Sequence, residues 1–314
     1  MKKKVVVLGG GTGMSYLLKG FKDFPVDITA IITVADNGKS TGKLREEFLT
    51  PAVGDIRKVL SNMSTLPTDI KSIMEYRFDT YSDLNGHPIG NLILTAFLNK
   101  TGSLKESIQY LSELLAVKHK VLPLSESYLT LMGETVDGEI ITGQVEIMKA
   151  YKEYKRIFYQ DEPDVLDEVI TELENADLII LSMGSLYTSI TPHLICPKVS
   201  DTIKKACAKV IYLCNIMSQP GETSNALVSK YLEHLEKYLG HHRIDAVIAN
   251  QTPISKEMLL KYEDEEKEPV KIDEEKIKNM GIELIKGDLI TLEDGTIKHD
   301  SMKLSSLIFS YLMR

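Results

Sequence analysis

The stretch that decides the fold is Val5-Val6-Val7-Leu8-Gly9-Gly10-Gly11-Thr12-Gly13. Its run of four apolar residues is typical of a strand buried on both faces. Glycines directly after a strand let a ligand approach the backbone, and a helix that begins there points free amide groups at an anion. The pattern is neither the dinucleotide GxGxxG, because residue 14 is Met, nor a P-loop, because no Gly-Lys-Ser/Thr follows. We predict a phosphate-binding loop at Gly10, Gly11, Thr12 and Gly13.

Strand and helix patterns alternate along the rest of the chain. The expected strands are Lys4–Leu8, Ile28–Val34, Leu178–Ser182, Val210–Cys214 and Ile244–Ala249. The expected helices are Met14–Phe21, Ile56–Met63, Asn91–Asn99, Lys105–Leu115, Val165–Glu174 and Ala226–Tyr238. This order predicts an α/β fold with a mainly parallel sheet and right-handed crossovers. Residues 120–160 break the rhythm, with a turn at Asp137-Gly138 and alternation on both sides of Thr142-Gly143, so we expect a small antiparallel excursion there. No domain boundary is visible, and residues 1–314 are expected to form a single domain.

Polar loops recur after the predicted strands, at the sheet edge where doubly wound folds bind ligands. Asp and Asn side chains suit sugar hydroxyls or a metal, and Ser and Thr hydroxyls suit phosphate oxygens. A helix cap beside solvated lysines is the simpler interpretation of the loop after the second strand. The candidates from these loops are Asp36, Asn37, Ser40, Thr41, Arg45, Ser185, Leu186, Thr188, Ser189, Asn215 and Glu222.

Two further motifs contribute candidates. Asp55 follows Gly54 and either caps the next helix or joins Asp36 at a metal. His87 lies in a turn before the predicted helix that begins at Asn91, and both are candidates. A lone His is usually structural. Arg77 is interpreted either as a cation for an anionic ligand or as part of a surface ion pair.

The composition excludes several classes of protein. The chain has 314 residues with a net charge of −8, which argues against binding to a nucleic-acid backbone but permits a small phosphorylated ligand. The first apolar run is too short for a signal peptide, and no stretch is long enough to span a bilayer. We therefore expect no nucleic-acid partner, no membrane insertion and a cytoplasmic location. Three cysteines without a CxxC pair predict neither a disulfide framework nor a zinc site, and Cys207 and Cys214 are expected in the core.

Seven motifs occur in a single order: GGGTG, VADNGKSTGKLR, GDIRKVLSNM, YRF, GHPIGNLIL, GSLYTSITPHL and NIMSQPGETS. With them the chain closely resembles the YvcK-like gluconeogenesis factors of the CofD-like superfamily, also called UPF0052. The resemblance implies a Rossmann-like three-layer α/β/α fold with a nucleotide-binding cleft. YvcK-like proteins are linked to growth on gluconeogenic carbon sources and to cell shape, and they bind UDP-sugars such as UDP-N-acetylglucosamine without an established reaction. The transferase branch moves a phospholactyl group from a guanosine diphosphate carrier onto a deazaflavin, with a divalent metal.

The departures from family patterns bear on the choice of branch. The transferases carry a Pro-Asp-x-Asp-Thr type segment where this chain has Gly54–Arg57, and a Ser-Asn-Pro type loop where it has Ser185–Tyr187. Both differences put transferase activity in doubt. Asn37 stands where many relatives have a second Asp, and Met183 stands where they usually have a proline. Both differences are typical of variation within the YvcK-like branch.

Two functions therefore stay open. The first is a regulatory protein that binds a UDP-sugar and reports to an unidentified protein partner, with a homodimer as the commonest assembly. The alternative is a transferase for a phosphoryl-linked group of the 2-phospholactate type, with Asp36 and Asp55 as candidate catalytic residues that hold Mg²⁺. A third function, NAD-dependent oxidation, is disfavoured by the imperfect glycine pattern.

Overall fold

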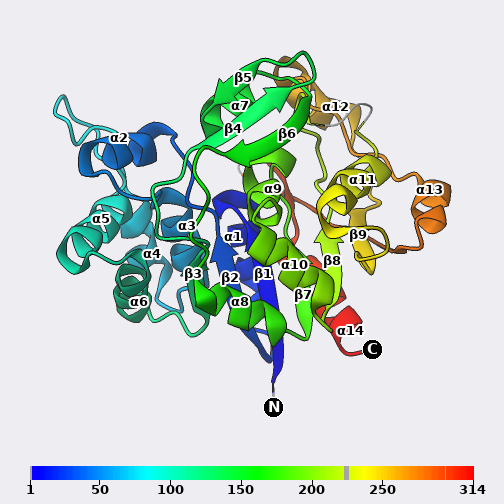
Figure 1. Cartoon of the computed structure of the whole chain (residues 1–314), viewed down its shortest axis with the longest axis horizontal. Coiled ribbons are helices and arrows are strands. Elements are labelled where there is room, and N and C mark those ends of the chain that lie inside the picture. Colours follow the sequence, from blue (N-terminus) through cyan, green and yellow to red (C-terminus); the bar gives the residue numbers. More distant parts are fainter. Residues whose placement is uncertain (1, 223–225, 294) are drawn as a thin grey trace.

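The computed structural model describes residues 2–222, 226–293 and 295–314. Their centre is a sheet in the order β10-β9-β8-β7-β1-β2-β3, in which every pairing is parallel (Figure 1). The strands are β1 (Lys3–Gly9), β2 (Val26–Ile32), β3 (Lys120–Pro123), β7 (Leu178–Leu181), β8 (Lys209–Leu213), β9 (Ala246–Asn250) and β10 (Glu283–Gly287). The five strands expected from the sequence are all present, and β3 and β10 are added at the two edges.

The strand order places a topological switch at β1. From β1 the chain proceeds outward to β2 and β3, and then returns to lie at the other side of β1 as β7, where Leu8 pairs with Leu181. Ligands of open parallel sheets bind outside the carboxyl ends of the strands at such a point. The loops after β1 and β7 are therefore the expected walls of a binding site.

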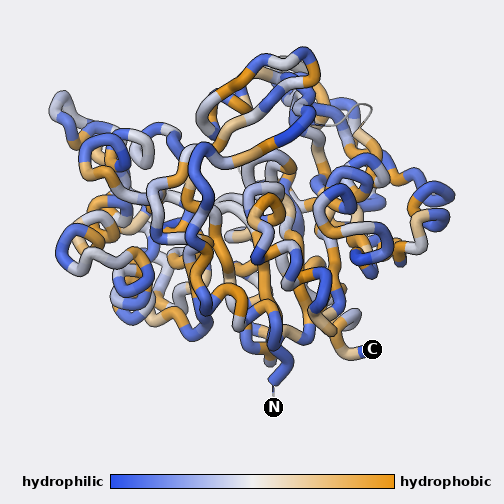
Figure 2. Tube along the Cα trace, viewed as in Figure 1, coloured by the Kyte–Doolittle hydropathy of each residue, from blue (hydrophilic) through white to orange (hydrophobic). Residues whose placement is uncertain are grey.

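Helices cover both faces of the sheet, which confirms the Rossmann-like three-layer fold. Val5 and Val7 share a core cluster with residues of α1, α3, α5, α6 and α14, whereas Val6 and Leu8 share one with residues of α8 to α11 and α13. The helices are α1 (Gly11–Phe21), α2 (Lys39–Phe48), α3 (Gly54–Met63), α4 (Thr68–Glu75), α5 (Ile89–Thr101), α6 (Leu104–Leu114), α7 (Gln144–Lys149), α8 (Asp167–Glu174), α9 (Thr191–Leu194), α10 (Pro197–Lys205), α11 (Val228–Leu239), α12 (Lys256–Leu259), α13 (Glu274–Asn279) and α14 (Ser301–Leu312), with a π-helical turn η1 (Leu186–Ile190) and a 3₁₀ turn η3 (Leu260–Glu265). Figure 2 shows the resulting apolar centre and the polar outer helix surfaces.

The antiparallel excursion is present but shorter than predicted. It consists of β4 (Leu131–Thr135), β5 (Ile140–Thr142) and β6 (Tyr154–Tyr159), and it lies at the top of Figure 1, beyond the carboxyl ends of the parallel strands. Lys120–Pro123 belongs instead to the main sheet, where it pairs in parallel with β2. After Thr142 the chain does not continue as a strand, because Gly143 adopts a φ of 105° and α7 begins.

The last part of the chain adds a hairpin and a final helix to the fold. An antiparallel hairpin, β11 (Ile290–Glu293) with β12 (Thr296–His299), precedes α14 and was not predicted from the sequence. Among the described residues, no helix combines the length and the apolar character that crossing a membrane requires.

Candidate functional site

A cleft of about 760 Å³ lies at the carboxyl edge of the sheet, next to the switch point at β1. Its walls come from the loops after β1, β2, β7 and β8, while α7 and β12 contribute residues from outside the main sheet. This volume is within the usual range for sites that bind small molecules.

Three helices begin at the cleft. Gly11 of α1, Lys39 of α2 and Gly54 of α3 all line it. None of these three helices has a side chain that caps its N-terminus by a hydrogen bond. Because the first amide groups of a helix have no partner within the helix, and because its dipole is positive at that end, the three N-termini together form a strong anion-binding environment.

The glycines of the first loop are required by close packing. A Cβ atom at Gly11 would lie 2.7 Å from the Asp55 Cα, and one at Gly13 would lie 2.8 Å from the Met183 carbonyl carbon. The loop after β1 is thus in contact with α3 on one side and with the loop after β7 on the other. Glycine allows these backbones to converge on one small volume.

The cleft carries a charge opposite to that of the whole chain. Its charged lining residues are Lys39, Arg57, Lys58, Arg77, Lys149, Lys267 and Lys298 on the basic side and Asp36 and Asp55 on the acidic side. The basic excess attracts an anionic ligand even though the protein is acidic overall.

The two acidic residues face the basic group of Lys58. Lys58 Nζ lies 3.1 Å from Asp55 Oδ1 and donates to Thr12 Oγ1 at 3.2 Å. Asp36 Oδ1 accepts from the Gly38 amide at 2.9 Å. Burial, and then the negative charge of Asp55, raise the pKa of Asp36. The charged form of Asp36 is therefore disfavoured unless a further cation lies nearby.

A buried hydrogen-bond network supports Ser40 from behind. Ser40 Oγ lies 2.8 Å from His87 Nδ1 and accepts from Asn91 Nδ2 at 3.1 Å. Asn91 Oδ1 in turn accepts from Arg57 Nε at 2.9 Å, and Arg57 forms an ion pair with Glu75. Burial lowers the pKa of His87 and so favours the neutral imidazole. His87 does not line the cleft; it positions Ser40, which does.

Arg45 and Asn37 also lie outside the lining. The Arg45 guanidinium is buried and donates to the carbonyls of Ala35 and Leu129 at 2.9 and 2.6 Å, which fixes the loop after β2. Asn37 Oδ1 accepts from the Val145 amide at 3.0 Å, so this side chain connects the same loop to α7. The terminal guanidinium nitrogens of Arg45 and the side-chain amide of Asn37 thus bond to groups within the protein.

The opposite wall is held by Asn215 and Ser185. Asn215 accepts from the Gly184 amide at 2.9 Å and donates to the Gly184 carbonyl at 2.7 Å. Ser185 Oγ accepts from the Thr188 amide at 3.1 Å and caps η1. Leu186 belongs to the apolar core, and Glu222 lines a side pocket that adjoins the cleft.

Most of the predicted site residues converge. Those that line the cleft are Gly11, Thr12, Gly13, Asp36, Ser40, Thr41, Asp55, Arg77, Asn91, Ser185, Thr188, Ser189 and Asn215. Those that do not are Gly10, Asn37, Arg45, His87, Leu186 and Glu222. Gly10 lies behind the lining, where a Cβ would be 2.7 Å from Ser189 Oγ. Thr223 and Ser224, at the end of the last motif, lie outside the described residues.

Sequence reasoning missed a group of lining residues from the last quarter of the chain. Tyr262, Lys298 and His299 all line the cleft. Asp300, which follows His299, caps α14 by accepting from the amides of Met302 and Lys303 at 3.1 Å. The adjacent basic Lys298-His299 pair was the available signal, but nothing local relates it to the glycine loop.

Comparison with known proteins identifies the family. A family model described as 2-phospho-L-lactate transferase CofD matches residues 5–290. The gluconeogenesis factor of Bacillus subtilis is 42% identical, with coverage of 99% of this chain and 98% of the relative. The gluconeogenesis factor of Halalkalibacterium halodurans is 40% identical, with coverage of 98% and 96%. A crystal structure of a UPF0052 protein from Bacillus halodurans superimposes with a TM-score of 0.94 at 40% identity, covering 98% of this chain and 99% of that one.

This chain belongs to the CofD family, in its YvcK-like gluconeogenesis factor branch. The resemblance inferred from the seven motifs is thereby confirmed over almost the whole chain.

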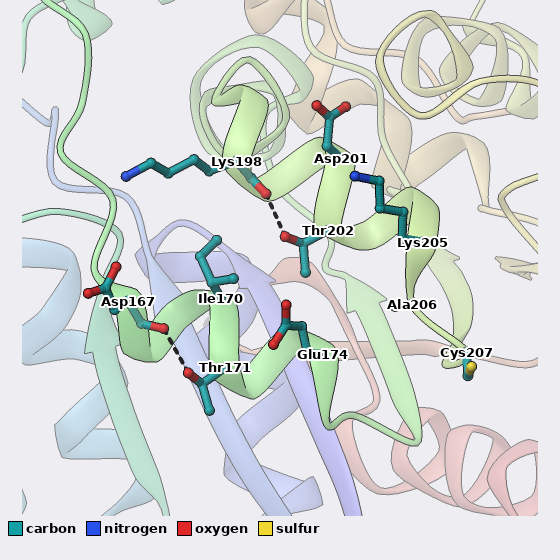
Figure 3. A pocket seen from close by; sticks show the side chains of 10 residues that line it. All are labelled: Asp167, Ile170, Thr171, Glu174, Lys198, Asp201, Thr202, Lys205, Ala206 and Cys207. Carbon is teal, nitrogen blue, oxygen red and sulfur yellow. Dashed lines mark hydrogen bonds between the residues drawn. The ribbon is translucent and has the colours of Figure 1, made fainter.

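A second groove lies between α8 and α10, away from the carboxyl edge of the sheet (Figure 3). Its hydroxyl groups are used within their own helices, since Thr171 donates to the Asp167 carbonyl and Thr202 to the Lys198 carbonyl. Cys207 is exposed at the end of this groove, so the expectation that it belongs to the core was wrong. The charged side chains that line this groove are all exposed, and no glycine loop contributes to it. We therefore assign the functional site to the cleft.

Proposed function

We propose that this protein is a regulatory protein that binds a UDP-sugar of the UDP-N-acetylglucosamine type and acts in growth on gluconeogenic carbon sources and in the control of cell shape. The observation that carries the ligand class is the convergence of three helix N-termini without side-chain caps on one basic cleft. A diphosphate suits this environment, because each helix end contributes free amides and positive potential. The names of the two relatives, both gluconeogenesis factors, support the role in growth on gluconeogenic carbon sources.

The residues assigned to the diphosphate are those of the first two loops. Gly11, Thr12 and Gly13 offer backbone amides, and Ser40 and Thr41 add hydroxyl donors from the start of α2. Tyr262 lines the same cleft and offers an aromatic face to the rest of the ligand. The regulatory role requires that the bound ligand favours one conformation, which a protein partner then recognises.

The second candidate function is transfer of a phosphoryl-linked group of the 2-phospholactate type, and the match to the CofD model favours it. Mg²⁺ usually binds one or two carboxylates together with ligand phosphates. Asp36 and Asp55 fit this role, because burial and then the nearby charge of Asp55 raise the pKa of Asp36, and a divalent cation would offset both effects. In this function Mg²⁺ would neutralise charge on the transferred group, while Lys58 and Arg57 would orient the phosphates.

Calorimetric titration separates the two functions. Purified protein is titrated with UDP-N-acetylglucosamine, GDP and NAD, each with and without Mg²⁺. We expect selective, metal-independent binding of the UDP-sugar. Preference for GDP with an absolute need for Mg²⁺ would instead support the transferase, and Asp36→Asn should then abolish product formation while the protein remains folded.

A further inference from the structure

A side pocket of about 260 Å³ opens beside the main cleft. The two cavities share Met148, Lys149, Ser185, Thr188, Gln219 and Lys267 as lining residues. They are therefore compartments of one site, and a ligand bound in the cleft is able to extend into the pocket.

Glu222 places a carboxylate in the wall of this pocket. Its side chain is 6% exposed and accepts a hydrogen bond from Ser185 Oγ. The other carboxylate oxygen, Oε2, is buried and has no hydrogen-bond partner. The amides of Leu186 and Tyr187 are close enough to lower the pKa of Glu222 partly, but neither makes a hydrogen bond to Oε2. A buried oxygen in this condition is costly, and it implies a partner that binds from outside.

Thr188 supplies a second group of the same kind. It is 1% exposed, and its backbone amide is used in the cap of η1. Its hydroxyl oxygen Oγ1 is buried without a partner, and the residue lines both cavities. The side pocket therefore offers an acceptor at Glu222 and, on the wall that it shares with the cleft, a hydroxyl at Thr188 that is able to donate or accept.

The chemistry of these two groups selects the part of the ligand that enters. A carboxylate repels phosphate but accepts hydrogen bonds from hydroxyl and N–H groups. Tyr187 and Met148 add apolar surface suited to a ring. Lysines line both cavities, but the three helix N-termini lie in the main cleft, and the phosphates belong there.

We propose that the side pocket binds an uncharged ring of the ligand, whose hydroxyl or N–H groups donate to Glu222 Oε2 and pair with Thr188 Oγ1. The inference rests on the proposed function, because the diphosphate in the cleft brings the ring to the pocket. Both the sugar and the pyrimidine of a UDP-sugar have the required chemistry.

Three probes test this inference: inorganic pyrophosphate, UDP and UDP-N-acetylglucosamine. Each is titrated into the unmodified protein, Glu222→Gln and Thr188→Val. Glutamine keeps the shape and can still accept from Ser185, but it places an N–H donor where Oε2 stood. We expect both variants to bind the probe that carries the ring more weakly, with an affinity at least tenfold lower for Glu222→Gln. Binding of pyrophosphate should be unchanged. A loss already present with UDP assigns the pocket to the pyrimidine, and a loss confined to UDP-N-acetylglucosamine assigns it to the sugar.

Matched variants control for the loss of buried polar groups. Thr95→Val removes another buried hydroxyl without a partner, and Glu236→Gln alters another buried carboxylate; neither residue lines the two cavities. Both should bind all probes normally. The inference fails if Glu222→Gln and Thr188→Val bind every probe like the unmodified protein. It also fails if they lose as much affinity for pyrophosphate as for the probe that carries the ring. If the unmodified protein binds none of the probes, the proposed function itself fails.

Discussion

At the residue scale, Glu222 shows how burial and charge oppose each other. Burial raises the pKa of Glu222 to about 7, from an ordinary value of 4.5, and the hydrogen bond from Ser185 offsets only part of this effect. The folded protein therefore binds a proton at this position between pH 4.5 and 7, where the unfolded chain does not. The resulting contribution to stability is complete below pH 4.5 and is lost as the pH rises through 7.

Glu222→Gln should remove this pH dependence. The pKa difference of 2.5 corresponds to about 3 kcal/mol, so the free energy of unfolding of the variant relative to the unmodified protein should increase by up to about 3 kcal/mol from pH 4.5 to pH 8. Urea unfolding at both pH values measures the difference. Buried histidines such as His193 are present in both proteins, so their contribution to the pH dependence of unfolding cancels in the difference. A difference independent of pH would show that Glu222 ionises normally in the folded state.

At the scale of elements, α7 is held in place by a side chain from a distant loop. Its own N-cap, Gly143, provides no side-chain hydrogen bond. Asn37 caps the N-terminus of α7 instead, because its Oδ1 accepts from the Val145 amide and its Nδ2 donates to Glu146 at 2.7 Å. This contact joins the excursion to the loop after β2, and it explains why Asn37 is found at the edge of the cleft without lining it.

Asn37→Ala should loosen α7 selectively. With the cap removed, we expect hydrogen exchange of the amides in residues 144–149 to accelerate about fivefold, corresponding to about 1 kcal/mol. The amides of β1 should keep their protection, since they lie in the centre of the sheet. Lys149→Ala, on the same helix but without the capping contact, serves as the control. Unchanged exchange in the Asn37 variant would mean that α7 is held by packing alone.

At the scale of the whole molecule, a chain of net charge −8 concentrates basic groups in its cleft. Lys39 lines the cleft at the start of α2, whereas Lys43, one turn later, is exposed outside it. Local potential, rather than net charge, decides whether an anionic ligand is attracted.

The two lysines provide a matched test. Lys39→Gln should weaken UDP binding about three- to tenfold at low salt and reduce its dependence on ionic strength, because a charge close to the phosphates is lost. Lys43→Gln should change neither quantity appreciably. Titrations at 50 and 500 mM NaCl measure both effects. Equal losses in the two variants would show that the potential around α2, and not the cleft residue, controls binding.

The sequence by itself determined the parts of this protein that follow from local signals. Solid apolar runs predicted the central strands, and the glycines and polar residues directly after them predicted the cleft, because the carboxyl ends of parallel strands meet at one edge. Gly11, Asp36, Ser40 and Ser189 were found in this way. The ordered motifs added the family.

Only the tertiary structure decided which polar residues face a ligand and which support the protein. Arg45 and Asn37 have the same polar character as Ser40, but they bind groups 84 and 108 residues away in the chain. Tyr262 reaches the cleft from a 3₁₀ turn and His299 from a hairpin, and nothing in the sequence near them relates either residue to the glycine loop. The unpartnered oxygens of Glu222 and Thr188 likewise exist only because distant segments bury them. Such roles depend on long-range packing, and the identity of a residue and its neighbours in sequence does not specify them.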